Sequence, residues 1–351
     1  MKNRDTAWTG SSETTREASV FNFDNVLFET TPNSSGVENL TPFFEWFLGF
    51  VEGDGSFVVR KFTTTKNPTA TRPYFVINQK DPKVLYTIKK RLGFGTIIKV
   101  AKTEKQNAYH RYAVSKLRHI EWLVHLFNGN LLLTKVHARF VKWVECFNSL
   151  CLAPDVALEK EMGRAPVHIK PFFKEAAHRV SLNSGWLAGF VDAEGGFYGS
   201  LAKNNRFATG YRDRWKFYIS QKNERWLLCR IGELVEEATW KKAGFVSKPA
   251  SWGEKNNAIE LKQRSNTYRC EILRIDSLKV LIDYFDRWPL LSKQRLVFVR
   301  WKRCILGRDG HKAAALKSEK GMRRYLRRFE SIGKIRQVAG KNDPDAERSM
   351  A

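Results

Sequence analysis

Acidic side chains are in short supply in this chain of 351 residues. Asp and Glu number 36 against 61 Lys and Arg, which gives a formal net charge of +25. A surface this basic favours a polyanionic partner, and an RNA-binding protein of the ribosomal type or a protein of anionic membranes fits as well. Aromatic residues are not scarce, at 13% with 11 Trp, so we expect folded domains rather than a disordered basic tail.

Cysteine is also rare and shows no ligand spacing. The five residues form no C-x-x-C pair, and none lies at zinc-finger spacing to a histidine pair. We therefore expect inert or buried thiols in a reducing compartment. The residues concerned are Cys146, Cys151, Cys229, Cys270 and Cys304.

Long apolar runs are missing. No window reaches the roughly 18 apolar residues of a membrane-spanning helix, so the sequence predicts no transmembrane helix. We expect no membrane partner. Residues 1–40 show no signal-peptide pattern and hold three basic against six acidic side chains, whereas a mitochondrial transit peptide is basic and poor in acids. We expect this segment to be a flexible polar leader.

What the chain does contain is a repeat. The string "WFLGFVEGDGSF" at Trp46–Phe57 returns as "WLAGFVDAEGGF" at Trp186–Phe197, 140 residues later. Two such strings at a domain-sized interval indicate a duplication.

The surroundings of the two strings repeat as well. Strand-like and helix-like segments follow each copy in the same order, which predicts an α+β fold of two pseudosymmetric α-β-β-α-β-β-α domains, each with one antiparallel sheet and helices on one face. The predicted segments are a leader (1–40), an N-terminal domain (41–150), a linker (151–182), a C-terminal domain (183–310) and a basic tail (311–351).

The second half is longer than the first. An insertion is expected within residues 239–266, and "AGFVSKP" at 243–249 is predicted as a strand. In the tail, "MRRYLRRF" at 322–329 is a candidate basic helix; it is either a solvated charged segment or a contact to nucleic acid.

Small residues recur every four positions in the repeated helices. They are Gly49 and Gly53 in the first copy and Gly185, Gly189 and Ala193 in the second. Glycine inside a helix costs roughly 0.5–1 kcal/mol relative to alanine, so another interaction must offset it. Since small residues four apart let two helices approach closely, we expect the repeated helices to pack against each other.

This packing would bring two acids together. With pseudo-twofold symmetry the C-terminal helix ends meet, and Asp54 and Glu194 become neighbours that repel each other. A divalent cation would neutralise them; oxygen ligands suit Mg²⁺, and metal ions can assist phosphodiester hydrolysis. The alternative is that both acids only cap local turns. Glu52 and Asp192 point about 160° away and are expected to form local hydrogen bonds or salt bridges.

The strings "FLGFVEGDG" and "LAGFVDAEG" resemble the signature motifs of double-motif LAGLIDADG homing endonucleases, over about residues 43–150 and 183–306. The resemblance implies a monomer whose two sheets form a saddle over the DNA major groove. It implies that Asp54 and Glu194 bind divalent metal together with Gly53 and Ala193, and that each acid serves one strand, leaving 3′ overhangs. Mg²⁺ is the expected metal, with Mn²⁺ as a substitute and Ca²⁺ binding without turnover.

The same resemblance implies further catalytic residues. Gln79 and Gln221, near the end of the second strand of each half, would orient the attacking water. Lys135 and Lys293 would act at the start of the last helix, although a surface lysine is the alternative for both. The unequal acids, Asp and Glu, predict unequal cleavage rates for the two strands.

Polar residues on the predicted strands are candidates for DNA readout. Arg and Asn suit base edges and Lys suits phosphates, and the alternative is a solvated polar face. The candidates are Arg60, Lys61, Thr63, Arg72, Tyr74, Asn78, Lys203, Arg206, Arg214, Lys216, Tyr218 and Lys222.

Together these features predict a site-specific, intron-encoded DNA endonuclease with a long asymmetric target. An RNA maturase that assists splicing of intron RNA on the same scaffold is the alternative. A DNA-binding regulator without catalysis is less favoured, because both acids and both glutamines are present. The expected compartment is the mitochondrion, with the chloroplast as alternative, since organelle-encoded proteins need no targeting peptide.

Overall fold

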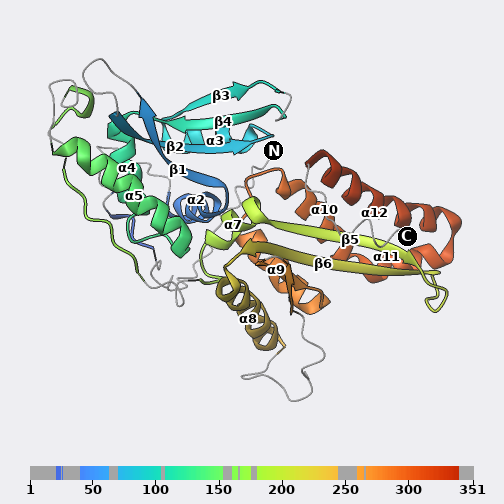
Figure 1. Ribbon diagram of the computed structural model, residues 1–351. Helices are drawn as coiled ribbons and strands as arrows, with labels where there is room; N and C mark the ends of the chain where they lie inside the picture. Colours follow the sequence, from blue (N-terminus) through green and yellow to red (C-terminus); the bar gives the residue numbers. More distant parts are fainter. Residues whose placement is uncertain are drawn as a thin grey trace, which may run out of the picture.

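The computed structural model describes residues 21–24, 26, 40–62, 70–103, 107–152, 160–164, 167–174, 180–243, 259–264 and 266–339. The first half contains α2 (Thr41–Asp54), β1 (Gly55–Phe62), β2 (Ala70–Gln79), α3 (Lys83–Leu92), β3 (Thr96–Val100), β4 (Tyr109–Val114), α4 (Leu117–Phe127) and α5 (Thr134–Cys151) (Figure 1). The second contains α7 (Trp186–Glu194), β5 (Gly195–Lys203), β6 (Tyr211–Lys222), α8 (Arg225–Lys242), β7 (Ile259–Arg264), β8 (Thr267–Ile272), α9 (Ile275–Arg287) and α10 (Gln294–Leu306). Helices α11 (Arg308–Lys317) and α12 (Glu319–Ala339) follow.

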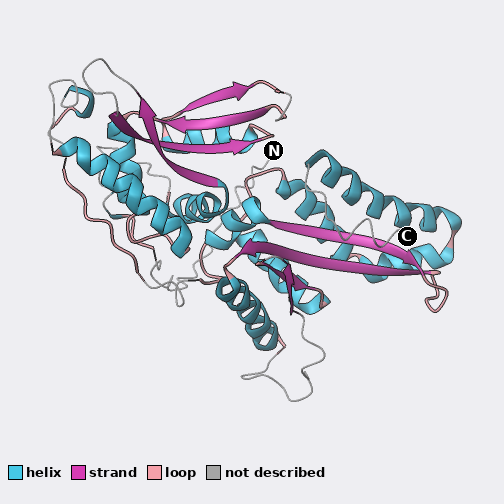
Figure 2. Ribbon diagram, in the orientation of Figure 1, coloured by secondary structure: helices cyan, strands magenta, loops and turns pink. Residues whose placement is uncertain are grey.

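Each half forms one four-stranded antiparallel sheet. The strand order is β1-β2-β4-β3 in the first half and β5-β6-β8-β7 in the second. Figure 2 shows the two sheets side by side with helices packed against them. The predicted α+β architecture of two similar halves is confirmed.

The sheet register relates the two halves residue by residue. Gly55, the residue after Asp54, pairs with Ile77, and Gly195, the residue after Glu194, pairs with Ile219. Gln79 and Gln221 both lie two residues beyond these partners and are therefore equivalent. The longer chain between Glu194 and Gln221 is absorbed at the far end of the β5–β6 hairpin.

The insertion lies between α8 and β7. Helix α8 has 18 residues where α3 has 10, and the chain to β7 is also longer. The strand predicted at 243–249 lies outside the described residues apart from Ala243. The edge strand that pairs with β8 in the described residues is β7.

One phenylalanine at the start of the first strand organises each core. Around Phe57, ring centroids lie at 5.7 Å (Phe75), 5.3 Å (Phe127), 5.4 Å (Phe140) and 5.1 Å (Trp143). Around Phe197 they lie at 5.6 Å (Phe217), 5.4 Å (Phe285), 5.3 Å (Phe298) and 5.0 Å (Trp301).

Part of the leader belongs to the first core. Phe21 and Phe23 are buried and Val26 is fully buried, and the Phe23 ring lies 5.4 Å from that of Phe44. Phe21, Phe23 and Val26 therefore pack on the core. Most other leader residues lie outside the described ones, and the flexibility expected for them stays a prediction.

The helices after the second half are ordered parts of the fold. The candidate basic helix at 322–329 lies within α12, whose Tyr325 and Phe329 are buried. The charged residues of this helix therefore occupy one side of it, while its aromatic residues pack on the protein.

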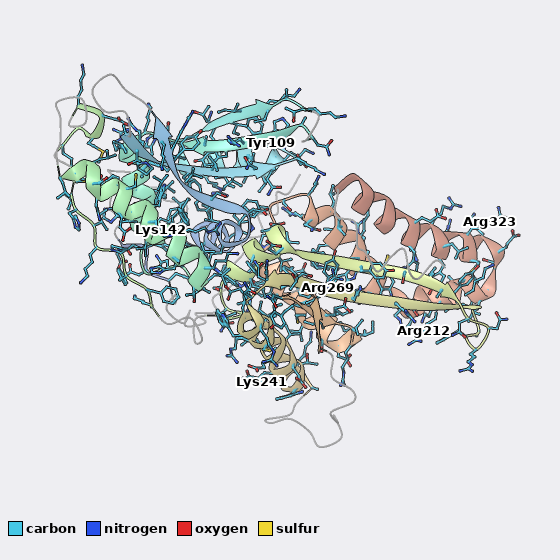
Figure 3. All side chains as sticks on the ribbon, in the orientation of Figure 1. Tyr109, Lys142, Arg212, Lys241, Arg269 and Arg323 are labelled. Atoms are coloured by element: carbon cyan, nitrogen blue, oxygen red, sulfur yellow. The ribbon has the colours of Figure 1, made fainter. Side chains whose placement is uncertain are left out.

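Basic side chains are spread over both halves. Figure 3 labels Lys142 on α5, Lys241 on α8, Arg269 on β8 and Arg323 on α12. None of the helices described is both long and apolar enough to cross a membrane. All five cysteines are free thiols.

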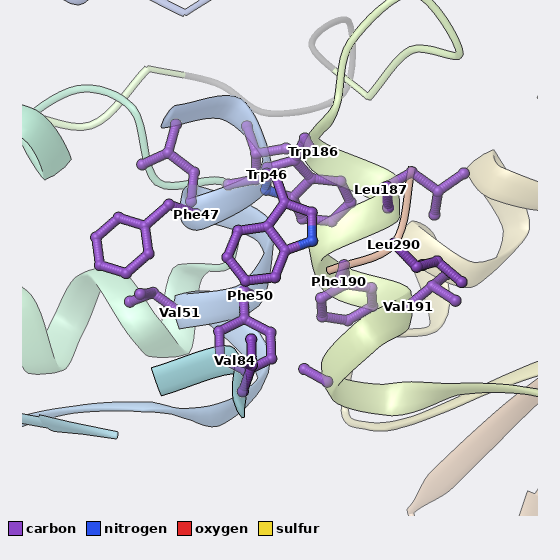
Figure 4. Packing of buried hydrophobic residues seen from close by; sticks show 14 of the residues in the cluster. Trp46, Phe47, Phe50, Val51, Val84, Trp186, Leu187, Phe190, Val191 and Leu290 are labelled. Atoms are coloured by element: carbon purple, nitrogen blue, oxygen red, sulfur yellow. The ribbon is translucent and has the colours of Figure 1, made fainter. Parts of the chain in front are cut away.

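Helices α2 and α7 pack directly on each other at the centre of the molecule (Figure 4). A Cβ atom on Gly49 would lie 1.9 Å from the carbonyl oxygen of Trp186, and one on Gly189 would lie 1.8 Å from that of Trp46. Because no side chain fits at either position, glycine is required at both. The predicted close packing of the repeated helices is confirmed.

Candidate active site and nucleic-acid interface

The two acids at the helix ends lie close together. Asp54 and Glu194 are the last residues of α2 and α7, and both are half-buried. The Cγ atom of Glu194 lies 3.1 Å from the position that a Cβ on Gly53 would take. The N–H groups of Gly55 and Gly195 bond to carbonyls within their own helices, so the turns close without the carboxylates.

A glutamine holds the first acid. The side-chain Nε2 of Gln79 donates a hydrogen bond of 2.5 Å to Oδ2 of Asp54. The Oε1 of Gln221 accepts a hydrogen bond of 2.9 Å from the backbone N–H of Lys222. The equivalent glutamines therefore differ in their contacts, and Gln79 positions a carboxylate oxygen.

A small cavity of about 60 Å³ beside Asp54 is shared by both halves. The second half contributes Lys293, and the first half contributes Asp54 itself. The lining residues are Asp54, Gln79, Asp81, Val84, Asp192, Ala193, Ser292, Lys293 and Gln294. The lysine of one half thus lies beside the acid of the other.

The lysine of the first half lies near a different acid of the second half. Lys135 is exposed in the first turn of α5. Burial raises the pKa of Glu224 in the second half, while a hydrogen bond from Trp226 and the positive charge of Lys135 act in the opposite direction. Lys135 is therefore close enough to Glu224 to influence its ionisation.

The other motif acids are buried and hydrogen-bonded. Oε1 of Glu52 accepts from the backbone N–H groups of Leu132 (2.7 Å) and Leu133 (2.6 Å), and Oε2 accepts from Trp186 Nε1 at 2.7 Å. The hydrogen bonding expected for Glu52 is present, but its partners lie 80 or more positions away in the sequence, and one belongs to the opposite motif helix.

Asp192 repeats this arrangement in the second half. Its Oδ2 accepts from the backbone N–H of Leu291 (2.7 Å) and from Trp46 Nε1 (2.9 Å), and Ser292 Oγ donates to its Oδ1 at 2.5 Å. Burial raises the pKa of Asp192, and the hydrogen bonds from Ser292, Leu291 and Trp46 act against this rise. Trp46–Asp192 and Trp186–Glu52 are called the crossed hydrogen bonds below.

Backbone hydrogen bonds to the same two acids relate the lysines of the two halves. Leu133 donates to Glu52 and Leu291 donates to Asp192, and Lys135 and Lys293 each follow two residues later. The two lysines are therefore equivalent, although they lie at different distances along the chain from their own acids.

The oxygen donors at the helix ends fit a hard divalent cation. Two carboxylates on meeting helix C-termini repel each other, and such ligands suit ions of the Mg²⁺ type. Gly53 and Ala193 lie directly opposite each other beside them: a Cβ on Gly53 would lie 2.4 Å from that of Ala193. Within the described part of the chain, no three His, Cys, Asp or Glu side chains gather into a metal-binding group.

The profile of the LAGLIDADG endonuclease family matches residues 47–147 and 187–305, one segment in each half. This chain belongs to the LAGLIDADG endonuclease family. The two matched segments begin within the motif helices α2 and α7 and contain the sheets that follow them.

Curated relatives of this LAGLIDADG chain are intron-encoded. It is 28% identical over 258 residues to "Probable intron-encoded endonuclease 4" of Neurospora crassa, covering 73% of this chain and 38% of that protein. It is 27% identical over 208 residues to "Probable intron-encoded endonuclease Cox1-I1b" of Schizosaccharomyces pombe, covering 58% and 52%. The chain thus spans between a third and about half of the length of these relatives.

Solved structures share the fold. The meganuclease I-SmaMI bound to uncleavable DNA has a TM-score of 0.56 at 17% identity, covering 85% of this chain and 100% of that one. The meganuclease I-AabMI bound to uncleaved DNA has a TM-score of 0.52 at 20% identity, covering 82% and 98%.

Each of the two sheets has one face covered by helices; we call the opposite face of each sheet its open face. In the first half, the guanidinium of Arg60 lies 6.0 Å from the ring centroid of Tyr74. Arg111 Nε donates a 2.9 Å hydrogen bond to Asn78, and its guanidinium lies 5.6 Å from the Tyr109 ring. Sequence reasoning missed Tyr109 and Arg111, although their alternation with buried Tyr112 is visible in the sequence.

The open face of the second half carries a buried acid. Glu271 is 2% exposed and lies 3.0 Å from Lys216 Nζ and 3.6 Å from Arg269. The rings of Tyr198 and Tyr218 lie beside the Lys216 ammonium. Glu271, Arg269 and Tyr198 were not predicted, because the sequence does not show which residues of neighbouring strands face each other.

Other predicted readout residues lie in different settings. Strand alternation places Lys61 with Phe57 and Lys203 with Phe197, on the helix side, at strand ends. Arg72 pairs with Glu161 of the linker region, which also accepts from Leu117 N–H. The remaining cases are Arg206 in the β5–β6 turn, exposed Arg214 and Lys222 on β6, and Thr63, which lies outside the described residues.

Proposed function

We propose that this chain is a site-specific double-strand DNA endonuclease that acts as a monomer on a long asymmetric site and leaves 3′ overhangs. The observation that carries the proposal is the meeting of Asp54 and Glu194 at the ends of the packed motif helices, between two open sheet faces. Each acid would serve one DNA strand. The relatives reported above are named as endonucleases, which is why DNA cleavage rather than RNA maturase activity is proposed.

The proposed cofactor is Mg²⁺, held by Asp54 and Glu194 with backbone oxygens of Gly53 and Ala193. When bound, such an ion polarises the phosphodiester and lowers the pKa of a bound water. Gln79 keeps one Asp54 oxygen in place. Lys293 supplies positive charge beside Asp54 from the second half. Its equivalent in the first half, Lys135, is proposed for the same role toward Glu194. One structure of I-SmaMI holds uncleaved DNA in the presence of calcium ions, which supports Ca²⁺ binding without turnover.

The proposed origin is an intron of a mitochondrial gene. Relatives of this chain are named for introns of cox1 in Schizosaccharomyces pombe and of ND4 in Podospora anserina. These names support the mitochondrion as compartment, and the chloroplast alternative has no such support.

The decisive experiment is plasmid cleavage with Mg²⁺ on a library of randomised target sites. The double variant Asp54→Asn/Glu194→Gln should lose at least about 100-fold in cleavage rate while it still binds selected DNA. Each single variant should accumulate nicked plasmid, because one strand is still cut. Asp309→Asn, which changes an exposed acid on α11, is the matched control. Cleavage at the normal rate by the double variant would contradict the proposal.

A further inference from the structure

The C-terminal helix pair, α11 and α12, covers the outer end of the β5–β6 hairpin. In Figure 1 the β5–β6 hairpin extends from α7 toward α11, with α12 alongside. The ring of Phe329 on α12 lies 4.6 Å from that of Trp215 on β6, and both side chains are buried. Helices α11 and α12 also pack closely on each other, since a Cβ on Gly321 would lie 2.0 Å from the carbonyl oxygen of Ala314.

A buried acid joins the hairpin to this pair. The side chain of Asp213 on β6 is 2% exposed. It binds Arg308 Nε at 2.7 Å and Lys312 Nζ at 2.6 Å, and it accepts a 2.9 Å hydrogen bond from Trp215 Nε1. Burial raises the pKa of Asp213, but the hydrogen bonds from Arg308, Lys312 and Trp215 outweigh this and bring it to about 2. The carboxylate is therefore charged and fully bonded at neutral pH.

In the first half, different residues contact the outer end of the equivalent hairpin, β1–β2. By sheet register, Thr71 takes the place of Asp213 and Pro73 that of Trp215. Helix α5 has 18 residues and reaches this region through Cys146, which bonds to Thr71. Helix α10 has only 13 residues, ends at Leu306, and is followed by the C-terminal helix pair. With Lys135 equivalent to Lys293, α5 extends three residues beyond the equivalent of Leu306, so the pair takes the place of the last turn of α5.

The supported end of the hairpin carries exposed arginines on its open face. Arg212 and Arg214 alternate with Asp213 and Trp215 and therefore point to the opposite side of the sheet. Asp213 is six residues along β6 from Ile219, the partner of Gly195 beside Glu194. At 3.3 Å per residue this is about 20 Å, or about six base pairs of DNA.

We propose that Asp213 is a positioning residue: through it, the C-terminal helix pair fixes the outer β5–β6 hairpin so that Arg212 and Arg214 recognise the outermost base pairs of one half-site. This inference rests on the proposed DNA cleavage. With the hairpin held in this way, discrimination between base pairs at the outer edge of the second half-site is stronger than an unsupported hairpin would give.

The test is the positional specificity of cleavage on a randomised library. A mismatched base pair typically costs about 1–3 kcal/mol, which is roughly 5-fold or more. In Asp213→Asn, discrimination at base pairs about six to eight from the cut on the second-half side should fall to less than about 2-fold. Discrimination near the cut and in the other half-site should stay. Asp213→Glu should restore the profile, and Glu319→Gln, which removes an exposed ion pair on α12, should not change it.

A second measurement does not depend on cleavage. Backbone amides of residues 200–203 and 211–214 should exchange with solvent at least about 10-fold faster in Asp213→Asn than in the unmodified chain or in Glu319→Gln. Phe329→Ala should have the same local effect. An unchanged exchange rate, or a loss of discrimination spread evenly over the whole target, would overturn the inference. Absence of any cleavage by the unmodified chain would instead reject the proposed endonuclease.

Discussion

Around Phe57 in the first half and Phe197 in the second, four aromatic rings lie at centroid distances that differ by no more than 0.1 Å between the halves. The open faces of the same two sheets have diverged. The cross-strand pair Val76–Ala113 in the first half corresponds to Tyr218–Glu271 in the second. After duplication, the residues that hold helix and sheet together were retained, whereas those facing outward changed.

The difference follows from what each kind of change costs. Removing an aromatic ring from a packed core typically costs about 3–5 kcal/mol, a large part of a domain's stability. Substitutions on an exposed face usually change stability by less than about 0.5 kcal/mol. Under the proposed function, the open faces can therefore adapt to two unlike DNA half-sites while both cores keep the acids of the motif helices in place.

The largest effect on stability should come from substituting the two equivalent glycines at the contact between α2 and α7. In Gly49→Ala and Gly189→Ala the new methyl group meets a backbone carbonyl, which no side-chain rotation can relieve. Each should lower the free energy of unfolding by about 3 kcal/mol or more, measured by urea unfolding. Gly310→Ala, with no neighbouring atom within 4 Å, should change it by less than about 1 kcal/mol. A large loss of stability in only one of the two variants would contradict the expected equivalence of Gly49 and Gly189.

Substitution of the buried motif acids should lower the free energy of unfolding by different amounts in the two halves. In Glu52→Gln the amide nitrogen must face an N–H donor at either oxygen position, so a loss of about 2–3 kcal/mol is expected. In Asp192→Asn the amide can donate to Ser292 Oγ, and the loss should be about 1 kcal/mol. Urea unfolding of both variants gives the comparison, and a larger loss for Asp192→Asn would contradict it.

At this position of the sheet, a decrease of stability at acidic pH is expected in the second half and not in the first. The pKa of Asp213 is lowered from 3.8 to about 2, so the unfolded state binds the proton more readily between these values. The stabilisation is then full above about pH 4 and is lost as the pH falls toward 2, whereas Thr71 does not titrate here. Asp213→Asn should lower the free energy of unfolding at pH 7 by about 2 kcal/mol. Unfolding at pH 7, 4 and 3 should also show a shallower acid dependence in the variant.

The smallest effect concerns the diverged open faces. Glu271→Gln removes the acid between Lys216 and Arg269, so non-specific duplex DNA should bind a few-fold more tightly, with a salt dependence steeper by about one phosphate contact. Fluorescence anisotropy at several salt concentrations measures both quantities. Glu237→Gln, which frees exposed Lys241 on α8, serves as control and should leave the slope unchanged.

The packing of the two motif helices could be predicted from the sequence. Gly49 and Gly189 predicted the packing of α2 on α7, since only very close approach justifies glycine at helical spacing. The equivalence of Gln79 and Gln221 followed from a near-constant distance to the motif acids. Which roles Asp54, Glu194 and their neighbours play in cleavage stays a prediction.

The rest depends on contacts between segments that are far apart in the chain. The crossed hydrogen bonds join residues more than 130 positions apart, and the tryptophans alone do not reveal their partners. The position of β7 depends on pairing with β8 after a long insertion. The tail was predicted to be either a solvated charged segment or a contact to nucleic acid, because its many basic residues drew attention away from two aromatic residues that are buried, Tyr325 and Phe329.

The crossed hydrogen bonds have a consequence for building chimeric nucleases. A hybrid that joins the first half of this chain to the second half of a relative inherits Trp46 and Glu52 from one parent and their partners from the other. Compatibility then requires an acceptor at the position of Asp192 and an indole at that of Trp186, whatever the DNA targets of the parents are. Choosing parents by these positions, rather than by overall identity, should decide which hybrids fold.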